Sequence, residues 1–260
     1  MEEKNKQITK IKRLGLIRQE LLDDGEISTE KLAKKFNVSH MTIHRDIEYL
    51  VSTNEAVRTY GGAAMAQRLT FEFSFQNNQQ KNLKEKKKIA KEAVKHVKDG
   101  QVIMLDTGTT TLQIAKELIG KRNVTIITTS LAIVSEVQFA ADIEVILLGG
   151  LLRGGSPDLH GPLTEQNIEQ FKTDILFMGA DAIDSAGNVY TDDLRVVNLD
   201  KKMAINTSKT IIVADSHKFG KSAMCKVLRS NDYDLILTDN KIDKKVFKQL
   251  KSKKIKFNTV

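Results

Sequence analysis

From residue 101 onward, the chain repeats short apolar runs, and several of them end in Asp, Gly, Thr or Ser. The runs lie in the segments QVIMLDTG, VTIITTS, EVILLGG, DILFMGADAI, TIIVADS and LILTDN. Stretches with apolar residues at helical spacing, such as TTTLQIAKEL and DKKVFKQLKS, alternate with them. Buried strands that alternate with helices are typical of a mostly parallel sheet covered on both faces. The sequence therefore predicts an α/β fold over residues 83–260.

The first part of the chain has a different pattern, in which apolar residues recur only at helical spacing. Such spacing predicts helices over residues 8–22, 28–36 and 39–50. Ser28 and Ser39 stand at the start of the second and third helices, where a hydroxyl can accept a hydrogen bond from a free backbone N–H. The segment LAKKFNVSHMTIHRDIEYL thus reads as two short helices joined by a tight turn.

A hairpin is expected to follow these helices. The segment AVRTYGGAAM, residues 56–65, reads as strand, Gly-Gly turn and strand, and residues 26–27 read as a short extended link. Three helices and a hairpin make a winged helix-turn-helix domain. The predicted organisation is a winged helix-turn-helix over residues 1–66, a polar linker over 67–82, and the α/β domain over 83–260.

The third predicted helix has a polar side opposite its apolar stripe of Ile43, Ile47 and Leu50. An α-helix fits the major groove of DNA, and recognition helices contact base edges with their N-terminal residues. Arg45 can contact phosphate or pair with guanine, and wing residues suit phosphate contact. Double-stranded DNA is favoured because no aromatic stacking platform is visible; spacing alone leaves open a helix-turn-helix that contacts only protein. The predicted DNA-binding residues are Ser39, His40, Thr42, His44, Arg45, Arg58 and Tyr60.

Net charge gives only weak support for a nucleic-acid partner. The chain carries a net charge of +8, but residues 1–66 contain 11 Lys and Arg against 10 Asp and Glu. The surplus lies in residues 67–98 and 241–260. Charge runs such as KEKKK are usually solvated faces of helices.

Two adjoining motifs in the first domain resemble a known family. VSHMTIHRDIEYL followed by AVRTYGGAAM is similar to the N-terminal domain of DeoR-family bacterial transcription regulators, whose pattern is approximately V-S-x-x-T-I-R-R-D-L and then R-x-H-G-G-A. The match covers Val38 to Ala63. His44 stands where the family usually has Arg, and Tyr60 where it usually has His. The resemblance implies operator DNA as a partner, and the two departures imply an altered operator preference.

The turn after the first predicted strand of the α/β domain carries a second motif. In IMLDTGTTTLQIAKEL, Gly108 permits a turn, and Thr109, Thr110 and Thr111 begin a helix. Free N–H groups at a helix N-terminus attract anions, and hydroxyls add donors, so phosphate suits this place. The alternative is that the threonines only cap the helix.

Polar residues also follow the other predicted strands. Because the carboxyl ends of parallel strands meet along one edge of a sheet, and ligands bind beyond that edge, we expect these residues to lie near one another. Threonines and cations suit a phosphate, and carboxylates suit sugar hydroxyls. The predicted effector-binding residues are Asp106, Gly108, Thr109, Thr110, Thr111, Thr129, Ser130, Gly150, Arg153, Asp181 and Lys218.

This second half resembles the effector domain of the DeoR family, which is similar to ribose-5-phosphate isomerase. The D-x-G-T-T turn matches at Asp106 to Thr110, and a D-S-x-K-F-G segment matches at Asp215 to Gly220. The linker FQNNQQKNLKEK departs from the family, which often has an arginine there. The resemblance implies a phosphorylated sugar as effector, with no further cofactor.

An enzyme is the rival interpretation: a sugar-phosphate isomerase with an accessory DNA-binding domain. Proton transfer needs a base within reach of the carbon acid, and Asp181, Asp184 or Lys218 could supply one. Against this, GADAID has Ala182 where the isomerase stretch G-A-D-E-x-D has glutamate. We therefore expect no catalytic residues. The histidines lack metal-ligand spacing, so no metal is expected either.

The remaining expectations concern compartment and assembly. Cys225 is the one cysteine, which favours a reducing compartment. No run of about 18 apolar residues occurs, so no membrane association is expected. One recognition helix reads too few base pairs for operator specificity, so a homo-oligomer, at least a dimer, is expected. Together with these expectations, the resemblance to the DeoR family implies a bacterial, cytoplasmic repressor of a sugar-catabolic operon, associated with the nucleoid when bound to DNA.

Overall fold

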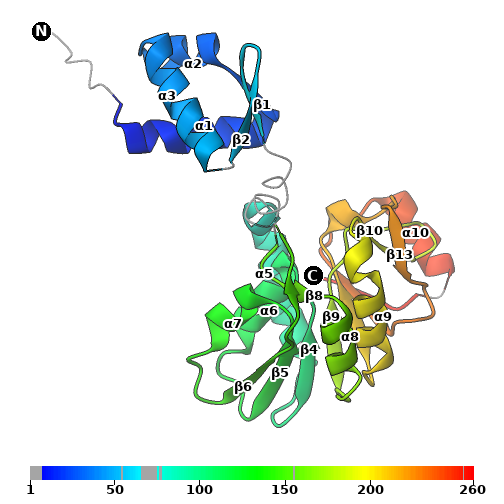
Figure 1. The fold of residues 1–260 in the computed structure, drawn as a ribbon. Helices are drawn as coiled ribbons and strands as arrows, with labels where there is room; N and C mark the ends of the chain where they lie inside the picture. The colour runs from blue at the N-terminus through cyan, green and yellow to red at the C-terminus, as the bar shows by residue number, and fades with distance from the viewer. Residues whose placement is uncertain (1–7, 54, 66–74, 76–77, 155, 254) are drawn as a thin grey trace, which may run out of the picture. The chain divides into compact units, whose positions relative to one another are not determined.

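The computed structural model of the chain describes residues 8–53, 55–65, 75, 78–154, 156–253 and 255–260 (Figure 1). Its contacts divide it into two compact units, residues 1–76 and 77–260. The division falls inside the segment expected as a linker, residues 67–82. Most of that segment lies outside the described residues.

Residues 8–65 of the N-terminal unit form helices packed on a small antiparallel sheet (Figure 1). The helices are α1 (Lys10–Asp24), α2 (Thr29–Phe36) and α3 (His40–Ser52), and the strands are β1 (Glu26–Ser28), β2 (Ala56–Thr59) and β3 (Gly62–Met65). The strand order is β1-β3-β2. The expected helices and hairpin are confirmed. The expected extended link at residues 26–27 is part of β1, which pairs with β3.

The helix boundaries of this unit follow the sequence signals. The Ser39 hydroxyl accepts a hydrogen bond from the backbone N–H of Thr42 at 3.1 Å, and Ser28 caps α2 in the same way. Gly25 ends α1 with a φ of 77°, a left-handed conformation that glycine adopts without steric cost. The apolar side of α3 is buried against the other helices, as Ile43 and Leu50 show.

A buried ion pair links α1 to α3. The Arg13 guanidinium donates to Asp46 from Nε at 2.5 Å and from Nη2 at 3.2 Å. Both side chains are almost fully buried, at 8% and 2% exposed. Removing one member of such a pair leaves an uncompensated buried charge, so the pair is coupled to the folding of the unit.

Gly62 is required where β3 meets β1. A Cβ on this residue would lie 1.9 Å from the carbonyl oxygen of Ile27. Any side chain would therefore push the two strands apart. The Gly-Gly pattern predicted only a turn, whereas the second glycine is also required for the packing of β3 on β1.

The C-terminal unit is built, in the part that the structure describes, on a seven-stranded parallel sheet (Figure 1). Its strands are β4 (Val102–Leu105), β5 (Val124–Thr128), β6 (Ile143–Leu147), β9 (Ile175–Met178), β12 (Thr210–Val213), β14 (Leu235–Thr238) and β15 (Phe257–Thr259). The order is β15-β14-β12-β9-β4-β5-β6. The direction of winding reverses between β4 and β9. The six predicted apolar runs all form strands of this sheet, and β15 is an addition from the basic C-terminal segment.

Helices cover both faces of this sheet. On one side α5 (Leu83–Val94) packs on α6 (Thr109–Leu118), and α6 packs on α7 (Leu131–Val137). On the other side α8 (Pro162–Ile168) packs on α9 (Val197–Ile205) (Figure 1). Helix α10 (Lys244–Ser252) connects β14 to β15. This is the doubly covered parallel sheet that the sequence predicts.

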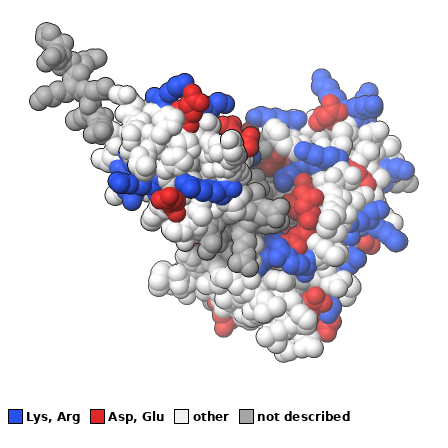
Figure 2. All heavy atoms as spheres, turned by 45° about the horizontal axis from the view of Figure 1, so that its top comes forward, with Lys and Arg blue, Asp and Glu red and all other residues white. Residues whose placement is uncertain are grey.

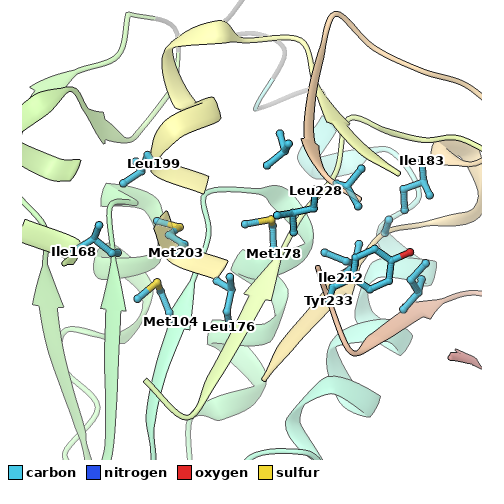
Figure 3. Close-up of a cluster of buried hydrophobic side chains, with 14 of the residues drawn as sticks. Met104, Ile168, Leu176, Met178, Ile183, Leu199, Met203, Ile212, Leu228 and Tyr233 are labelled. Atoms are coloured by element: carbon cyan, nitrogen blue, oxygen red, sulfur yellow. The ribbon is translucent and has the colours of Figure 1, made fainter. Parts of the chain in front are cut away.

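The core between α9 and the sheet contains long apolar side chains. Figure 3 shows Leu199 and Met203 of α9 facing Met104 of β4 and Leu176 and Met178 of β9. The cluster continues into a second, antiparallel sheet made of β10 (Ala182–Ile183), β11 (Val189–Thr191) and β13 (Cys225–Leu228). A hairpin of β7 (Leu151–Leu152) and β8 (Leu159–His160) completes the strands.

Candidate functional site

The outward side of α3 presents the polar residues that the sequence singled out. Ser39, His40 and Arg45 are exposed, and Thr42 and His44 are partly exposed. The hydroxyls of Ser39 and Thr42 lie 2.9 Å apart. The start of α3 thus offers three charged or ionisable side chains and a pair of hydroxyls to a partner.

The wing is tied to α3 by an arginine. The Arg58 guanidinium lies 2.9 Å from Nδ1 of His44 and 3.5 Å from a carboxylate oxygen of Glu48. Tyr60, at the tip of the wing, is fully exposed at 111%. The predicted wing residues therefore flank the predicted helix residues. Met41, which the polar pattern did not include, is also 61% exposed at the start of α3.

The surface charge agrees with the weak net-charge signal of the sequence. Figure 2 shows Lys and Arg side chains in separate groups over this face, with Asp and Glu between them.

The second candidate site lies at the carboxyl ends of β4 and β9, where the winding of the sheet reverses. Asp106, directly after β4, accepts hydrogen bonds from the backbone N–H of Gly179 at 2.9 Å and of Thr107 at 2.6 Å. Burial raises the pKa of Asp106 to about 6, against the effect of these two N–H groups. Ligands of open α/β sheets bind at such reversal points.

The start of α6 lacks a side-chain cap. Gly108 is its N-terminal cap, and no side chain of the described residues caps it. Thr110 is 8% exposed, and its hydroxyl has no hydrogen-bond partner in the described part of the chain. Thr111 differs, because its hydroxyl is fully buried and donates to the Gly108 carbonyl at 2.9 Å. Thr109 is partly exposed.

The backbone at Gly108 does not need glycine. Its φ is −166°, an extended conformation that any residue adopts. A Cβ there would lie 3.3 Å from the Thr111 hydroxyl oxygen, a tight contact. The chain turns from β4 into α6 at this place, and the small size of Gly108 makes room for Thr111.

Hydroxyls join the ends of β4 and β5. The Thr129 and Thr107 side-chain oxygens lie 3.1 Å apart. Ser130 caps α7 by accepting from the N–H of Ile133 at 3.3 Å. The predicted residues Thr129 and Ser130 are thus both buried and both already in hydrogen bonds.

Arg153 is held by carboxylates. Its guanidinium donates to Asp158 and to Asp193, each at 2.9 Å, and to the Ser156 hydroxyl at 3.0 Å. Asp158 in turn pairs with the backbone of Ser130, which brings this loop over the end of β5. Arg153 therefore lies beside the strand ends, as predicted, but its charge is shared with two aspartates.

Gly150 is required for close packing. A Cβ on Gly150 would lie 2.0 Å from the Thr164 hydroxyl oxygen and 2.7 Å from the His160 carbonyl oxygen. The Thr164 hydroxyl donates to the carbonyl of Gly149 at 2.8 Å. The glycine lets α8 and the β7–β8 hairpin approach the end of β6.

The last two predicted residues belong to different neighbourhoods. Asp181 accepts hydrogen bonds from the Thr191 hydroxyl and the Asp192 N–H, both at 3.0 Å. Lys218 is in η2 (Ser216–Lys218), after β12, and its charge acts on the buried Lys86 of α5. Asp181 is linked to the Arg153 cluster because it binds the N–H of Asp192, and the next residue, Asp193, binds Arg153. Lys218 lies toward α5 instead.

Sequence reasoning missed Asp200. This residue of α9 follows the core residue Leu199 and is 8% exposed. Burial is the first cause that raises its pKa well above the usual value, and the negative charge of Asp106 is the next. The sequence gives no distinct signal for Asp200, because it stands among the polar residues Asn198, Lys201 and Lys202. Attention to strand ends alone passed over it.

Two classes of site find no support in the described residues. Among them, no group of three or more His, Cys, Asp and Glu side chains is placed to hold a metal ion. None of their helices combines the length and the apolar character that crossing a membrane requires.

Comparison with known proteins identifies both halves. The DeoR-like helix-turn-helix domain matches residues 13–68, and the DeoR C terminal sensor domain matches residues 81–240. The chain is 30% identical to the glycerol-3-phosphate regulon repressor of Escherichia coli K12, over 83% of this chain and 85% of that protein. It is 32% identical to the transcriptional regulator GolR of Listeria innocua, over 88% and 91%. It is also 32% identical to the transcriptional repressor AccR of Agrobacterium fabrum, over 85% and 86%.

Among solved structures, ribose 5-phosphate isomerase A from Methanocaldococcus jannaschii aligns with 53% of this chain and 55% of its own length, at a TM-score of 0.40 and 26% identity. A winged helix-turn-helix followed by a sensor domain on a parallel sheet defines a DNA-binding transcription regulator. The chain belongs to the DeoR family of such regulators.

Proposed function

We propose that this regulator is a repressor of a sugar-catabolic operon and that a phosphorylated sugar controls its affinity for operator DNA. The start of α6 carries this proposal. An uncapped helix N-terminus and the unpartnered hydroxyl of Thr110 occur together there, at the point where the winding of the sheet reverses. Free N–H groups and a free hydroxyl bind a phosphate, and Asp106 and Asp181 lie nearby for sugar hydroxyls.

The named relatives support regulation rather than catalysis. They are repressors and regulators, and one of them represses a regulon named for a phosphorylated polyol. We propose that the chain acts as a homo-oligomer on double-stranded DNA in the bacterial cytoplasm. The effector lowers operator affinity if it binds the DNA-incompetent state more tightly than the DNA-competent state.

Four of the predicted contact residues carry the proposed contacts. On α3 and the wing, Arg45 would contact a base or phosphate, and Arg58 a phosphate. At the sheet edge, Thr109 and Thr110 would contact the phosphate. The structure adds one refinement to this proposal: Arg153 would act through the carboxylates it holds in place, because its guanidinium is already paired with them.

A gel-shift assay on DNA flanking the gene for this protein tests the proposal. The assay is repeated with a panel of sugar phosphates and with the same sugars lacking phosphate. We expect a specific complex that one phosphorylated sugar releases and its unphosphorylated form does not. A specific complex that no sugar phosphate releases would overturn the assignment of the effector, while the DNA-binding assignment would stand.

A further inference from the structure

The side of α3 that faces away from the core of its domain follows from which residues of the helix are buried. The buried residues are Ile43, Asp46, Ile47 and Leu50. Because an α-helix has about 3.6 residues per turn, the stripe opposite them contains Met41, Arg45 and Glu48. All three are exposed, and we call them the outer stripe of α3. A partner that approaches α3 from outside the domain meets the outer stripe first.

Several polar side chains of this region already have partners within the domain. The Ser39 hydroxyl accepts from the N–H of Thr42 at 3.1 Å and lies 2.9 Å from the Thr42 hydroxyl. Nδ1 of His44 lies 2.9 Å from Nη2 of Arg58, and because a guanidinium can only donate, Nδ1 is the acceptor. Arg58 also lies 3.5 Å from the carboxylate of Glu48, the last residue of the outer stripe. Part of the hydrogen-bonding capacity of these side chains is therefore used within the domain.

The other two residues of the outer stripe, Met41 and Arg45, differ in this respect. Met41 is 61% exposed, and no described group forms a hydrogen bond or an ion pair with the side chain of Arg45. One exposed apolar side chain is ordinary on a protein surface. Met41, however, is in the first turn of α3, and recognition helices contact base edges with their N-terminal residues. Its position in the surface that would contact DNA makes Met41 a candidate for base contact.

The chemistry of a methionine side chain restricts what it can recognise on a base. Its thioether sulfur is only a weak acceptor, and the side chain has no donor, so it gains little from the polar groups of base edges. The one alkyl group that base pairs present in the major groove is the C5 methyl of thymine. Contact between this methyl and a methionine removes apolar surface of both from water. The unbranched, flexible side chain of methionine also adapts its shape to the surface that it contacts.

We propose that Met41 is a specificity-determining residue that packs against the C5 methyl of one thymine in the DNA contacted by each copy of α3. This inference rests on the proposed binding of operator DNA and adds what one residue recognises there. Arg45 follows Met41 by four residues, which is about 6 Å along the helix axis. Successive base pairs lie about 3.4 Å apart along DNA. The thymine should therefore lie within about two base pairs of the group that Arg45 contacts.

Deoxyuridine tests this contact in the full-length protein, because it lacks the C5 methyl of thymidine and keeps the same base pairing. Footprinting of the complex from the gel-shift assay defines the operator, and the thymines inside it are then replaced one at a time. The protein is titrated at fixed salt against each duplex. We expect one replacement per copy of α3 to weaken binding about fourfold, which corresponds to about 0.8 kcal/mol for one methyl group. Unchanged affinity for every substituted duplex would overturn the inference.

The variant Met41→Ala assigns the methyl contact to one residue, because alanine favours the helix and lacks the atoms that would reach the base. We expect this variant to bind the unmodified operator about fourfold more weakly. It should also bind the thymine and deoxyuridine forms of the sensitive position equally. Met224→Ala is the matched control, since Met224 is 68% exposed in the C-terminal unit, and it should keep the preference for thymine. A preference that persists unchanged in Met41→Ala would overturn the role of Met41.

These outcomes are distinct from a failure of the proposed function. A specific complex that tolerates deoxyuridine at every position would refute only the thymine contact, and the proposed repressor would stand. The absence of any specific complex with DNA would refute the proposed binding of an operator and the thymine contact with it.

Discussion

The side-chain amide of Asn82 donates a hydrogen bond to the Asp215 carboxylate across 3.0 Å and so joins the start of α5 to the end of β12. Asn82 has a φ of 53°, and its amide also lies 3.1 Å from Nδ1 of His217. One turn later, the buried Lys86 ammonium donates to the carbonyl of Asn78. The residues that lead from the expected linker into the sensor domain are thus fixed to the strand end that carries Lys218.

Asn82→Ala should destabilise the C-terminal unit. It removes a hydrogen bond to a buried carboxylate and places a Cβ-bearing residue without a local hydrogen bond in the left-handed region, so the free energy of unfolding should fall by about 1–3 kcal/mol. Urea unfolding measures the change. Glycine adopts the left-handed conformation easily, so the fall in unfolding free energy of Asn82→Gly reports mainly the loss of the side-chain hydrogen bond. A glycine variant as stable as the wild type would show that the hydrogen bond contributes nothing.

Asp46→Ala should destabilise the N-terminal unit by about 3–5 kcal/mol, because it leaves the Arg13 charge buried without its partner. Thermal unfolding followed by circular dichroism checks this, and operator binding should be lost in parallel. Glu30→Gln is the control: Glu30 forms an ion pair with Lys34 on the surface, and its removal should change stability little. Equal effects of the two variants would contradict the role given to the buried pair.

Arg45→Ala should weaken operator binding by about 1–3 kcal/mol if Arg45 contacts a base. The measurement is a titration at fixed salt against operator and unrelated DNA. Arg122→Ala removes one exposed positive charge from the other unit and controls for net charge. Unchanged operator affinity would refute the contact. A loss that is the same on both DNAs would assign Arg45 to phosphate instead of a base.

Thr110→Val should abolish the response to the sugar phosphate and leave operator binding intact, because it removes the free hydroxyl at the start of α6. Thr111→Val is a matched control. The Thr111 hydroxyl is committed to the Gly108 carbonyl, so its loss should lower stability by about 0.5–1.5 kcal/mol without changing effector affinity. If calorimetry showed normal effector binding by Thr110→Val, the phosphate would have to bind elsewhere.

The raised pKa of Asp106 predicts a pH dependence of stability. Burial raises this pKa from 3.8 to about 6. Between these values the unfolded carboxyl has lost its proton while the folded one keeps it. The contribution of Asp106 to stability is therefore full below about pH 4 and is lost as the pH rises through about 6.

Urea unfolding between pH 4 and pH 7 tests this for the wild type and for Asp106→Asn, which does not titrate. The difference in unfolding free energy, wild type minus variant, should be largest at the acidic end and fall as the pH rises. A difference that stays constant across the window would contradict the raised pKa.

The sequence predicted the parallel sheet well because each buried strand is a long apolar run with a polar end. It did not predict β7, β8, β10 or β11, since strands of two or three residues leave no periodic pattern. Strand β15 was read only as part of a basic segment, because Phe257 stands among lysines.

Prediction of the site was less complete for a different reason. Sequence position brought Asp106, Thr110 and Arg153 to one edge of the sheet, which follows from parallel topology. It could not show that Arg153 is shared by Asp158 and Asp193, because that depends on how the loop after β7 folds back. Asp200 was missed because it lies on α9, which covers the face of the sheet opposite α6, and does not follow a strand.

The order β1-β3-β2 has a consequence for how the N-terminal domain is made. The middle strand of the sheet is the last one synthesised, and it must fit Gly62 against Ile27, which leaves the ribosome much earlier. Until β3 emerges, β1 and β2 have no common partner, and the wing does not exist. A nascent chain therefore cannot complete the sheet of this domain until its final strand has been synthesised.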